Sequence, residues 1–302
     1  MQTSRRHFLQ TALATGTGLA LTAGAGAIEP IKRSGKPLTR LSICAYSYRQ
    51  YLTSKKKDEK PAMTMHDFID TVAGMRLDAV ELTQYYFAET TPEYLNGLKL
   101  HCSRLGLDVS GTAVGNNFCV SDPEKLKAQL AMVKEWIEHS SRLGAKTMRI
   151  FAGKVEKDDP EEKVRERVIE SISAACEHAA KYGIILALEN HGDLTSTADQ
   201  VLAIVKAVKS DNFGVNLDTG NFHSDDPYEE LAKVAPYAVT AHLKVEIQRG
   251  KQKAEETDFA KIFAMLRTAG YRGYGSLEYE AAEDPKTAVP RAVETIRKAM
   301  DA

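Results

Sequence analysis

Short apolar runs alternate with longer amphipathic segments from residue 41 to the end of the chain. The runs are rich in Val, Ile, Leu and Ala, and several become polar at their last residues, which is typical of buried strands that end at the edge of a sheet. The eight runs lie near 41–46, 77–82, 107–114, 146–151, 184–191, 213–218, 239–244 and 274–279. This alternation predicts a parallel sheet in which a helix links each strand to the next.

The intervening segments carry start and stop signals for helices. Pro123 and Pro160 mark two starts. The apolar residues that follow recur at helical spacing: Leu126, Leu130, Val133 and Ile137 in the first segment, and Val164, Val168, Ile172 and Cys176 in the second. Glycines between a helix and the following strand favour a left-handed helix end, and they stand at Gly106, Gly144, Gly183 and Gly270. The recurrence predicts an α/β fold, an eight-stranded parallel (β/α)8 TIM barrel.

Composition agrees with a single large domain. The chain has 302 residues, 43% hydrophobic and 27% charged, which is ample for a substantial core, and we place the barrel domain at 40–302. The net charge is -1, and no cluster of Lys and Arg lies along one face, so a nucleic-acid partner is disfavoured. We expect a small neutral or weakly charged substrate. Both a monomer and a homo-oligomer remain open.

Residues 1–27 carry an export pattern. Arg5 and Arg6 precede an uncharged stretch that is rich in Ala, Gly, Leu and Thr and ends at Ala25-Gly26-Ala27, similar to a twin-arginine (Tat) signal peptide. Its Gly and Thr content makes a permanent membrane span the poorer interpretation. We therefore expect recognition by the Tat export machinery, a periplasmic or otherwise exported protein, and a linker at 28–39. Export argues against a phosphorylated sugar as substrate, because such metabolites are held in the cytoplasm.

Two further features leave alternatives open. The four cysteines, Cys44, Cys102, Cys119 and Cys176, show no Cys-x-x-Cys spacing, which removes support for zinc-ribbon and thioredoxin-like sites. We interpret them as buried apolar residues, with a Cys102–Cys119 disulfide left open. The segment 46–63 contains the run Lys55-Lys56-Lys57. It is compatible with a lid, a partner contact or a solvated loop, and the solvated loop is the default.

Four candidate metal ligands stand at the ends of strand runs. They are Glu189, Asp218, His242 and Glu278, and about one strand plus one helix separates each from the next. The carboxyl ends of barrel strands converge on a single mouth, so these side chains are expected to meet around one ion. An isolated carboxylate at such a position is better explained as a strand cap or surface ion pair, but four in the same register are not.

The motifs around these residues carry a family resemblance. They are Leu188-Glu189-Asn190-His191-Gly192, Leu217-Asp218-Thr219-Gly220-Asn221, His242-Leu243-Lys244 and Leu277-Glu278-Tyr279-Glu280. Together they resemble the sugar phosphate isomerase/epimerase family with the xylose isomerase-like barrel, over roughly residues 40–300. The resemblance implies one divalent cation, often Mn, Mg, Co or Zn, held by Glu189, Asp218, His242 and Glu278. It also implies that Glu189 and Glu278 are catalytic, one removing a proton from a sugar carbon and the other returning it.

The chemistry is sensible apart from the resemblance. A metal that polarises a carbonyl acidifies the neighbouring C–H and stabilises the enediolate that forms. Two carboxylates on opposite faces of a small-molecule carbohydrate then permit inversion. We therefore expect an exported, divalent-metal-dependent sugar isomerase or epimerase. Neither the sugar nor the metal is decided by the sequence.

Five further residues are candidate substrate contacts, each with a structural alternative. His191 shares a strand face with Glu189 if the strand continues that far, or is satisfied by backbone. Lys244 stabilises an oxyanion, or is solvated. Asn221 binds a hydroxyl, or serves its own turn. Glu81 and Arg149 reach into the mouth, or form buried structural ion pairs. His101, His139 and His178 fall on helices and receive no role.

Departures from the family pattern keep rival functions open. Asn221 stands where several ketose epimerases have histidine, and Val245 stands where many relatives have aspartate. The main rival is a lyase or hydrolase that acts on keto-sugars or 3-keto-glycosides by the same first step. A non-catalytic sugar-binding barrel ranks below both enzymes. An apurinic-site endonuclease is disfavoured, because too few histidines end strands and the charge is balanced.

Overall fold

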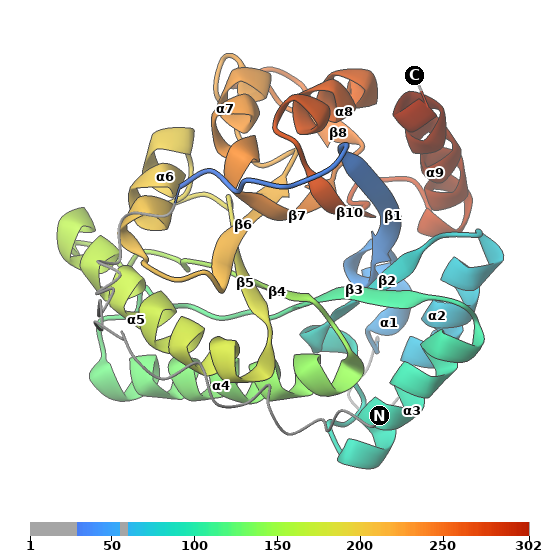
Figure 1. The fold of residues 1–302 in the computed structure, drawn as a ribbon, viewed down its shortest axis with the longest axis horizontal. Coiled ribbons are helices and arrows are strands. Elements are labelled where there is room, and N and C mark those ends of the chain that lie inside the picture. Colours follow the sequence, from blue (N-terminus) through green and yellow to red (C-terminus); the bar gives the residue numbers. More distant parts are fainter. Residues whose placement is uncertain (1–28, 55–59, 302) are drawn as a thin grey trace, which may run out of the picture.

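The computed structural model describes residues 29–54 and 60–301. Eight parallel strands close into a barrel in the order β1-β10-β7-β6-β5-β4-β3-β2, as Figure 1 shows. The barrel strands are β1 (Leu38–Cys44), β2 (Ala79–Thr83), β3 (Asp108–Ala113), β4 (Thr147–Ile150), β5 (Ile185–Glu189), β6 (Phe213–Asp218), β7 (Ala238–Leu243) and β10 (Arg272–Leu277). The predicted (β/α)8 fold is confirmed. Parallel neighbours need crossover connections, and the amphipathic segments supply them.

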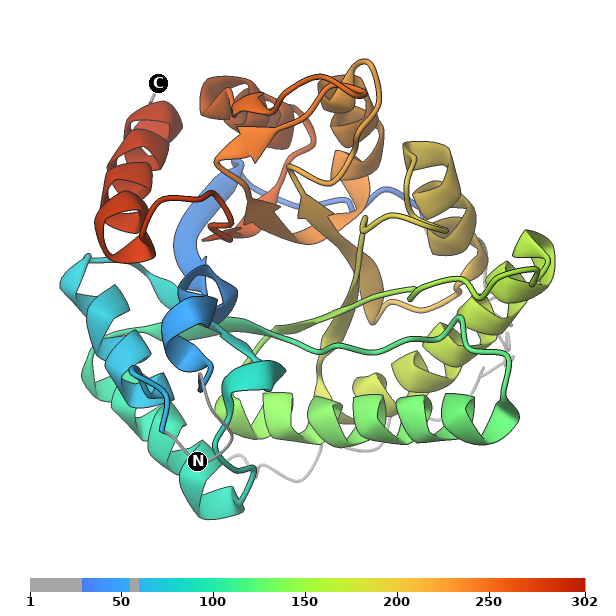
Figure 2. The same ribbon diagram turned by 180° about the vertical axis from the view of Figure 1, so that it is seen from behind.

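The helices form an outer ring around the barrel, as both views show (Figures 1 and 2). They are α1 (Arg49–Leu52), α2 (Met65–Gly74), α3 (Pro92–Arg104), α4 (Pro123–Leu143), α5 (Glu161–Tyr182), α6 (Ala198–Ala207), α7 (Pro227–Val234), α8 (Phe259–Thr268) and α9 (Pro285–Asp301). Short 3₁₀ helices occur at η1 (Ala45–Tyr48), η2 (Gln84–Tyr86) and η3 (Ala235–Tyr237), and β8 (Glu246–Ile247) pairs with β9 (Glu255–Glu256) beyond the end of β7. No helix among the described residues is long and apolar enough to span a membrane.

The predicted helix signals agree with the observed ends. The helix predicted after Pro123 is α4, in which Val133 and Ile137 are fully buried, and the stripe predicted after Pro160 lies in α5 and is buried throughout. The four glycines predicted at left-handed helix ends all have positive φ, between 66° and 81°. Only a residue without a Cβ adopts this conformation without strain. These glycines therefore return the chain from helix to strand.

The strand ends differ from the predicted runs at two site positions. β5 ends at Glu189, and Gly192, with φ of 70°, helps to turn the chain toward a bridge with Thr195. Strand alternation therefore does not extend to His191. β7 ends at Leu243, so Lys244 is the first residue beyond the strand. Both residues belong to loops at the mouth.

The described parts of the predicted linker, 28–39, and of the predicted solvated loop, 46–63, pack more closely against the protein than the sequence predicts. Ile31 donates its backbone N–H to Pro236 at 3.0 Å, and β1 begins at Leu38, inside the segment predicted as a linker. In the 46–63 segment Tyr48 is fully buried, and Met63 donates its backbone N–H to Tyr51 at 3.0 Å. The default of a solvated loop is therefore wrong for the described part. The lysine run predicted there, and residues 1–27, lie outside the described residues.

The cysteines are free and buried. Burial raises the pKa of Cys102, Cys119 and Cys176 to about 12. The expected role as apolar residues of the core is confirmed for these three, and the Cys102–Cys119 pair is not formed, whereas Cys44 contacts the Glu278 carboxylate and lies outside the hydrophobic core.

Candidate metal centre

The four candidate ligands meet inside the mouth of the barrel. Glu189 ends β5, Asp218 ends β6, His242 lies near the end of β7, and Glu278 follows β10 by one residue. One ligand atom from each of the four lies within 4.8 Å of the others. All four side chains are buried, and Asp218 and His242 are fully so. The sequence alone led to this set, and the fold brings all of it together.

The separations between these atoms suit one coordination sphere. His242 Nδ1 lies 3.4 Å from Glu189 Oε2, 3.4 Å from Glu278 Oε2 and 3.8 Å from Asp218 Oδ2. Two ligands that are each about 2.1 Å from one ion lie roughly 3.0–3.4 Å apart. In addition, the buried atoms His242 Nδ1 and Asp218 Oδ2 have no hydrogen-bond partner among the described residues. Buried polar atoms without partners are costly, so the donor set fits a divalent cation.

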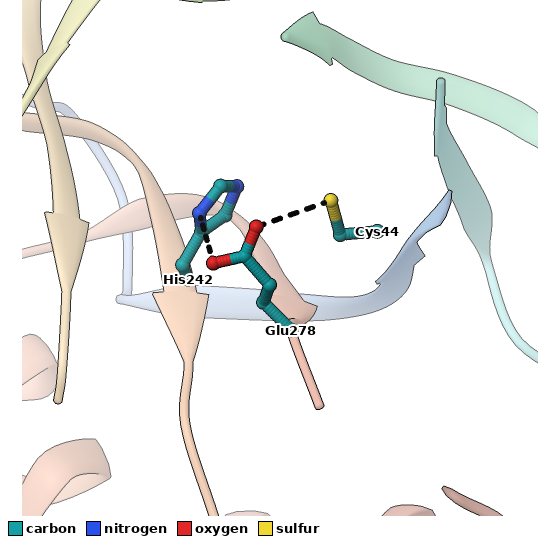
Figure 3. A group of neighbouring side chains, drawn as sticks. All are labelled: Cys44, His242 and Glu278. Carbon is teal, nitrogen blue, oxygen red and sulfur yellow. Dashed lines mark hydrogen bonds and ion pairs between the residues drawn. The ribbon is translucent and has the colours of Figure 1, made fainter. Parts of the chain in front are cut away.

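Glu81 fixes the orientation of His242. Its Oε1 lies 2.8 Å from His242 Nε2, and a carboxylate can only accept, so Nε2 carries the proton. Nδ1 then faces Glu278, as Figure 3 shows. This carboxylate–histidine pair is a common support for a ligating imidazole. Glu81 was predicted as a candidate substrate contact, but its carboxylate contacts His242, and the alternative of a buried ion pair describes it.

Glu189 is held by one ion pair and two hydrogen bonds. Arg149 Nε lies 3.1 Å and Asn216 Nδ2 2.9 Å from its Oε2, while Asn221 Nδ2 lies 3.3 Å from its Oε1. Burial disfavours the charged form of Glu189, but the Arg149 guanidinium and His242 outweigh burial and lower the pKa of this carboxyl. Arg149 lies 3.9 Å over the Phe151 ring and is itself buried. It therefore forms the buried ion pair that the sequence left as an alternative.

Asp218 is built into the turn that follows β6. Gly220 donates its backbone N–H to Oδ1 at 2.9 Å, and the Asn190 side chain accepts from the Asp218 N–H at 2.9 Å. Oδ2 remains directed into the centre, 3.5 Å from Lys244 Nζ. Burial raises the pKa of Asp218 to about 7, against the opposing attraction of Lys244. Burial therefore favours the protonated form of Asp218 more than it would be favoured in an exposed aspartate.

Lys244 lies among the carboxylates. Its Nζ is 2.6 Å from Glu278 Oε2, and it also contacts Glu280. Its side chain is buried, so the solvated alternative does not describe it. Burial alone would lower the pKa of Lys244, but Asp218 and Glu278 outweigh burial and raise it well above the usual value. Burial likewise opposes ionisation of Glu278, but His242 and Lys244 hold its pKa well below the usual value.

The remaining candidates line the open side of the mouth. His191 is exposed, donates its backbone N–H to Thr195 Oγ1 at 2.9 Å, and has its ring centroid 4.5 Å from that of Phe151. It lines one cavity of about 460 Å³ together with Asn221 and His223, and a second of about 370 Å³ together with Phe151.

The helix histidines His101, His139 and His178 contact surface carboxylates instead.

Three residues of the centre were not predicted. Asn216 lies two positions before Asp218 on β6, so strand alternation offered a signal for it, whereas Glu280 lies beyond the end of β10, where alternation no longer applies. Cys44 lies 3.6 Å from Glu278 Oε1 and ends β1, a strand whose last residues are mostly apolar. Nothing in its own segment distinguishes it. Only closure of the barrel places it beside β10.

Comparison with solved structures gives the same fold. A structure of L-ribulose 3-epimerase is 19% identical, with a TM-score of 0.71 over 87% of this chain and 95% of that one. A 3-keto-D-glucoside 4-epimerase from E. coli is 16% identical, with a TM-score of 0.68 over 86% of this chain and 100% of that one. The IolI protein with a bound zinc atom is 20% identical, with a TM-score of 0.68 over 86% and 96% of the two chains.

Sequence comparison identifies the family. No curated protein sequence matches the chain. The model of the xylose isomerase-like TIM barrel family matches residues 69–299. This span includes all four candidate ligands and most of the barrel. The chain belongs to the xylose isomerase-like TIM barrel family.

Proposed function

We propose that this protein is a divalent-metal-dependent isomerase or epimerase of a small carbohydrate. The observation that carries the proposal is the placement of two carboxylates, Glu189 and Glu278, around His242 Nδ1, each with Oε2 at 3.4 Å. A cation held by these residues with Asp218 and His242 supplies Lewis acidity to a carbonyl of the sugar. The fold and the names of the similar structures support a sugar as substrate.

Each glutamate retains a second oxygen for proton transfer. Oε1 of Glu189 contacts Asn221, and Oε1 of Glu278 contacts Cys44, whereas the Oε2 atoms are the ones that face His242 Nδ1. The residues come from strand ends that β6 and β7 separate in the barrel. We propose that one glutamate removes the proton from the carbon beside the carbonyl and that the other delivers a proton to the opposite face of the enediolate.

The surrounding cations and amides have supporting roles in this proposal. Lys244 and Arg149 lie beside Glu278 and Glu189 and oppose the negative charge that develops on the substrate oxygens. Asn221 and His191 line the cavity at the mouth and are positioned to contact sugar hydroxyls. We propose Asn221, His191 and Lys244 as substrate contacts, and Glu81 and Arg149 as supports of the ligands.

The first test combines metal content with hydrogen exchange. The purified protein is expected to bind about one divalent ion per chain and to move deuterium from solvent into one carbon of a responsive keto-sugar in a panel. If the two glutamates act on opposite faces of the sugar, each of the variants Glu189→Gln and Glu278→Gln should reduce the exchange rate of one epimer more than that of the other. The surface variant Glu138→Gln serves as control. The proposal would be refuted if the unmodified protein bound no metal and moved no deuterium into any sugar of the panel.

A lyase acting on 3-keto-glycosides is the second candidate, since one structure of this fold is a 3-keto-D-glucoside 4-epimerase. Proton removal beside the keto group is the shared step, after which a leaving group departs instead of a proton returning. A 3-keto-glycoside in the panel separates the two functions. Release of free aglycone with no epimer formed decides for the lyase, and epimer without aglycone decides for the epimerase.

Export is a separate proposal. We propose that residues 1–27 direct the folded protein through the twin-arginine machinery, because Arg5 and Arg6 precede an uncharged stretch. Fractionation of cells that express the full chain should place the shortened protein in the periplasm, and the change of Arg5 and Arg6 to Lys should retain it uncleaved. Equal fractions for both chains would contradict the proposal.

A further inference from the structure

The end of β1 and the 3₁₀ helix η1 hold Glu278 from one side. Ser47, buried in η1, donates from Oγ to the carbonyl of Leu277 at 2.8 Å and accepts the N–H of Tyr279 at 2.9 Å. These two bonds fix the main chain immediately before and after Glu278. The backbone of the proposed acid–base residue is therefore set by a segment 230 residues away in sequence.

Cys44 holds the side chain of the same glutamate. Its Sγ lies 3.6 Å from Glu278 Oε1 (Figure 3). The carboxylate can only accept, so the thiol donates. In the part of the chain that the structure describes, this is the one hydrogen bond to that oxygen. Cys44 is fully buried, and Thr83 Oγ1 lies 3.4 Å from its sulfur, so when the S–H is directed to Glu278 the Thr83 hydroxyl can donate to the sulfur.

The Oε1 oxygens of the two glutamates are consequently held by donors of different strength. Oε1 of Glu189 accepts from the Asn221 amide, whereas Oε1 of Glu278 accepts from a thiol, and the strong donor Lys244 lies at Oε2 of Glu278. An S–H group is a weak donor. It directs the oxygen while reducing its basicity less than an amide or hydroxyl would. In Figure 3 the two oxygens of Glu278 face different partners, Oε1 toward Cys44 and Oε2 toward His242.

We propose that Cys44 is a positioning residue for proton transfer by Glu278: its S–H holds Oε1 toward the substrate while Oε2 stays with the metal ligands. The kinetic part of this inference rests on the proposed function. The hydrogen bond itself does not, and it is measurable without a substrate.

Infrared spectroscopy of the S–H stretch tests the bond. The difference between unmodified protein and Cys44→Ala identifies the Cys44 band among the four thiols. Replacing the carboxylate by the weaker acceptor in Glu278→Gln should move this band to higher frequency. Glu189→Gln is the matched control, since it makes the same change in the same centre without touching Cys44, and it should leave the band in place. A band that Glu278→Gln does not move overturns the inference.

Hydrogen exchange on the metal-loaded enzyme tests the role. Cys44→Ala should lower kcat for deuterium exchange by about tenfold, with little change in KM and an unchanged metal content. Cys44→Ser should exchange faster than Cys44→Ala, because serine keeps a hydrogen-bond donor. Its pH–rate profile should be shifted from that of the unmodified enzyme, because O–H is a stronger donor than S–H. Cys176→Ala, which removes a buried thiol away from the mouth, should leave the rate and the profile unchanged.

The outcomes distinguish this inference from the proposed function. Full kcat in Cys44→Ala overturns the positioning role even if the bond exists. If Cys44→Ala fails to fold, Cys44→Ser and the Glu278→Gln band still decide. If the unmodified enzyme exchanges no sugar, the proposed function fails and the positioning role fails with it, whereas an active enzyme with an unmoved band refutes the inference alone.

Discussion

The two ring nitrogens of His242 face different partners. Nε2 contacts Glu81 at 2.8 Å, and Nδ1 faces Glu189 and Glu278 without a hydrogen bond among the described residues. An imidazole that donates from one nitrogen offers a lone pair at the other. Glu81 therefore selects the tautomer in which Nδ1 is available to a cation.

Removal of Glu81 should weaken metal binding. We expect Glu81→Ala to lower Mn²⁺ affinity by about 10- to 100-fold. The His242 imidazole loses the partner that orients it and the negative charge that raises its basicity as a ligand. Glu81→Gln, which keeps an acceptor but not the charge, should lose less. Calorimetric titration of the metal-free protein measures both. Equal affinity in all three proteins would show that His242 is not oriented by Glu81.

Metal affinity should rise with pH. Burial raises the pKa of Asp218 to about 7. Burial lowers that of His242, but Glu81 and Glu278 outweigh it and hold the pKa well above the usual value. Both groups bind protons in the metal-free centre, and a cation displaces them. Affinity should therefore increase as pH rises through 7, by about tenfold per unit for each proton displaced. Titration in buffers of different ionisation enthalpy counts the released protons, and a count of zero would contradict this.

Among the elements, the helix ends depend on glycine conformation. Gly183 ends α5 with φ of 67°, and a Cβ placed there would meet nothing within 4 Å. Gly97 lies within α3, and its surroundings are equally open. The two sites therefore differ in backbone conformation and not in available space.

This pair allows a matched prediction for stability. Gly183→Ala should lower the free energy of unfolding by about 1 kcal/mol, because alanine is strained in the left-handed region. Gly97→Ala should raise it by about 0.5–1 kcal/mol, because alanine favours the helix. Urea unfolding of the two variants and the parent measures both effects. The same sign of change in both would argue against the conformational explanation.

At the scale of the whole molecule, the centre depends on closure of the barrel. β1 pairs in parallel with both β10 and β2, so Cys44 reaches Glu278 and lies next to Glu81 in the register. The candidate ligands come from β5, β6, β7 and the end of β10. Their carboxylates and His242 are buried together, so a bound cation is linked to the stability of the fold.

Metal should therefore raise the thermal stability of the chain. At a concentration 100 times Kd, a ligand that binds only the native state contributes about 2.7 kcal/mol, which for a protein of this size corresponds to a rise in Tm of roughly 5 °C or more. Scanning calorimetry with Mn²⁺ and with a chelator measures the difference. His242→Ala should fold but show a much smaller rise. An equal rise in His242→Ala would place the metal elsewhere.

The fold and the meeting of the four candidate ligands could be predicted because local signals carry them. The apolar runs, the helix-start prolines and the glycines at helix ends each act within one β/α unit, and the polar ends of four runs follow from strand topology. His191 was harder, because the end of β5 at Glu189 depends on a turn that the apolar pattern does not mark. The sequence predicted that Glu81 and Arg149 belong to the mouth, but not that they pair with His242 and Glu189.

The sequence by itself determined the strands, the helices that link them and which carboxylates stand at the mouth, since hydrophobic periodicity and backbone preference are properties of neighbouring residues. Only the tertiary structure decided which atoms meet. The contact of Cys44 with Glu278, the pairing of Glu81 with His242 and the burial of Lys244 depend on the register between strands and on the closure of β1 against β10. These are long-range relations, and no local pattern encodes them.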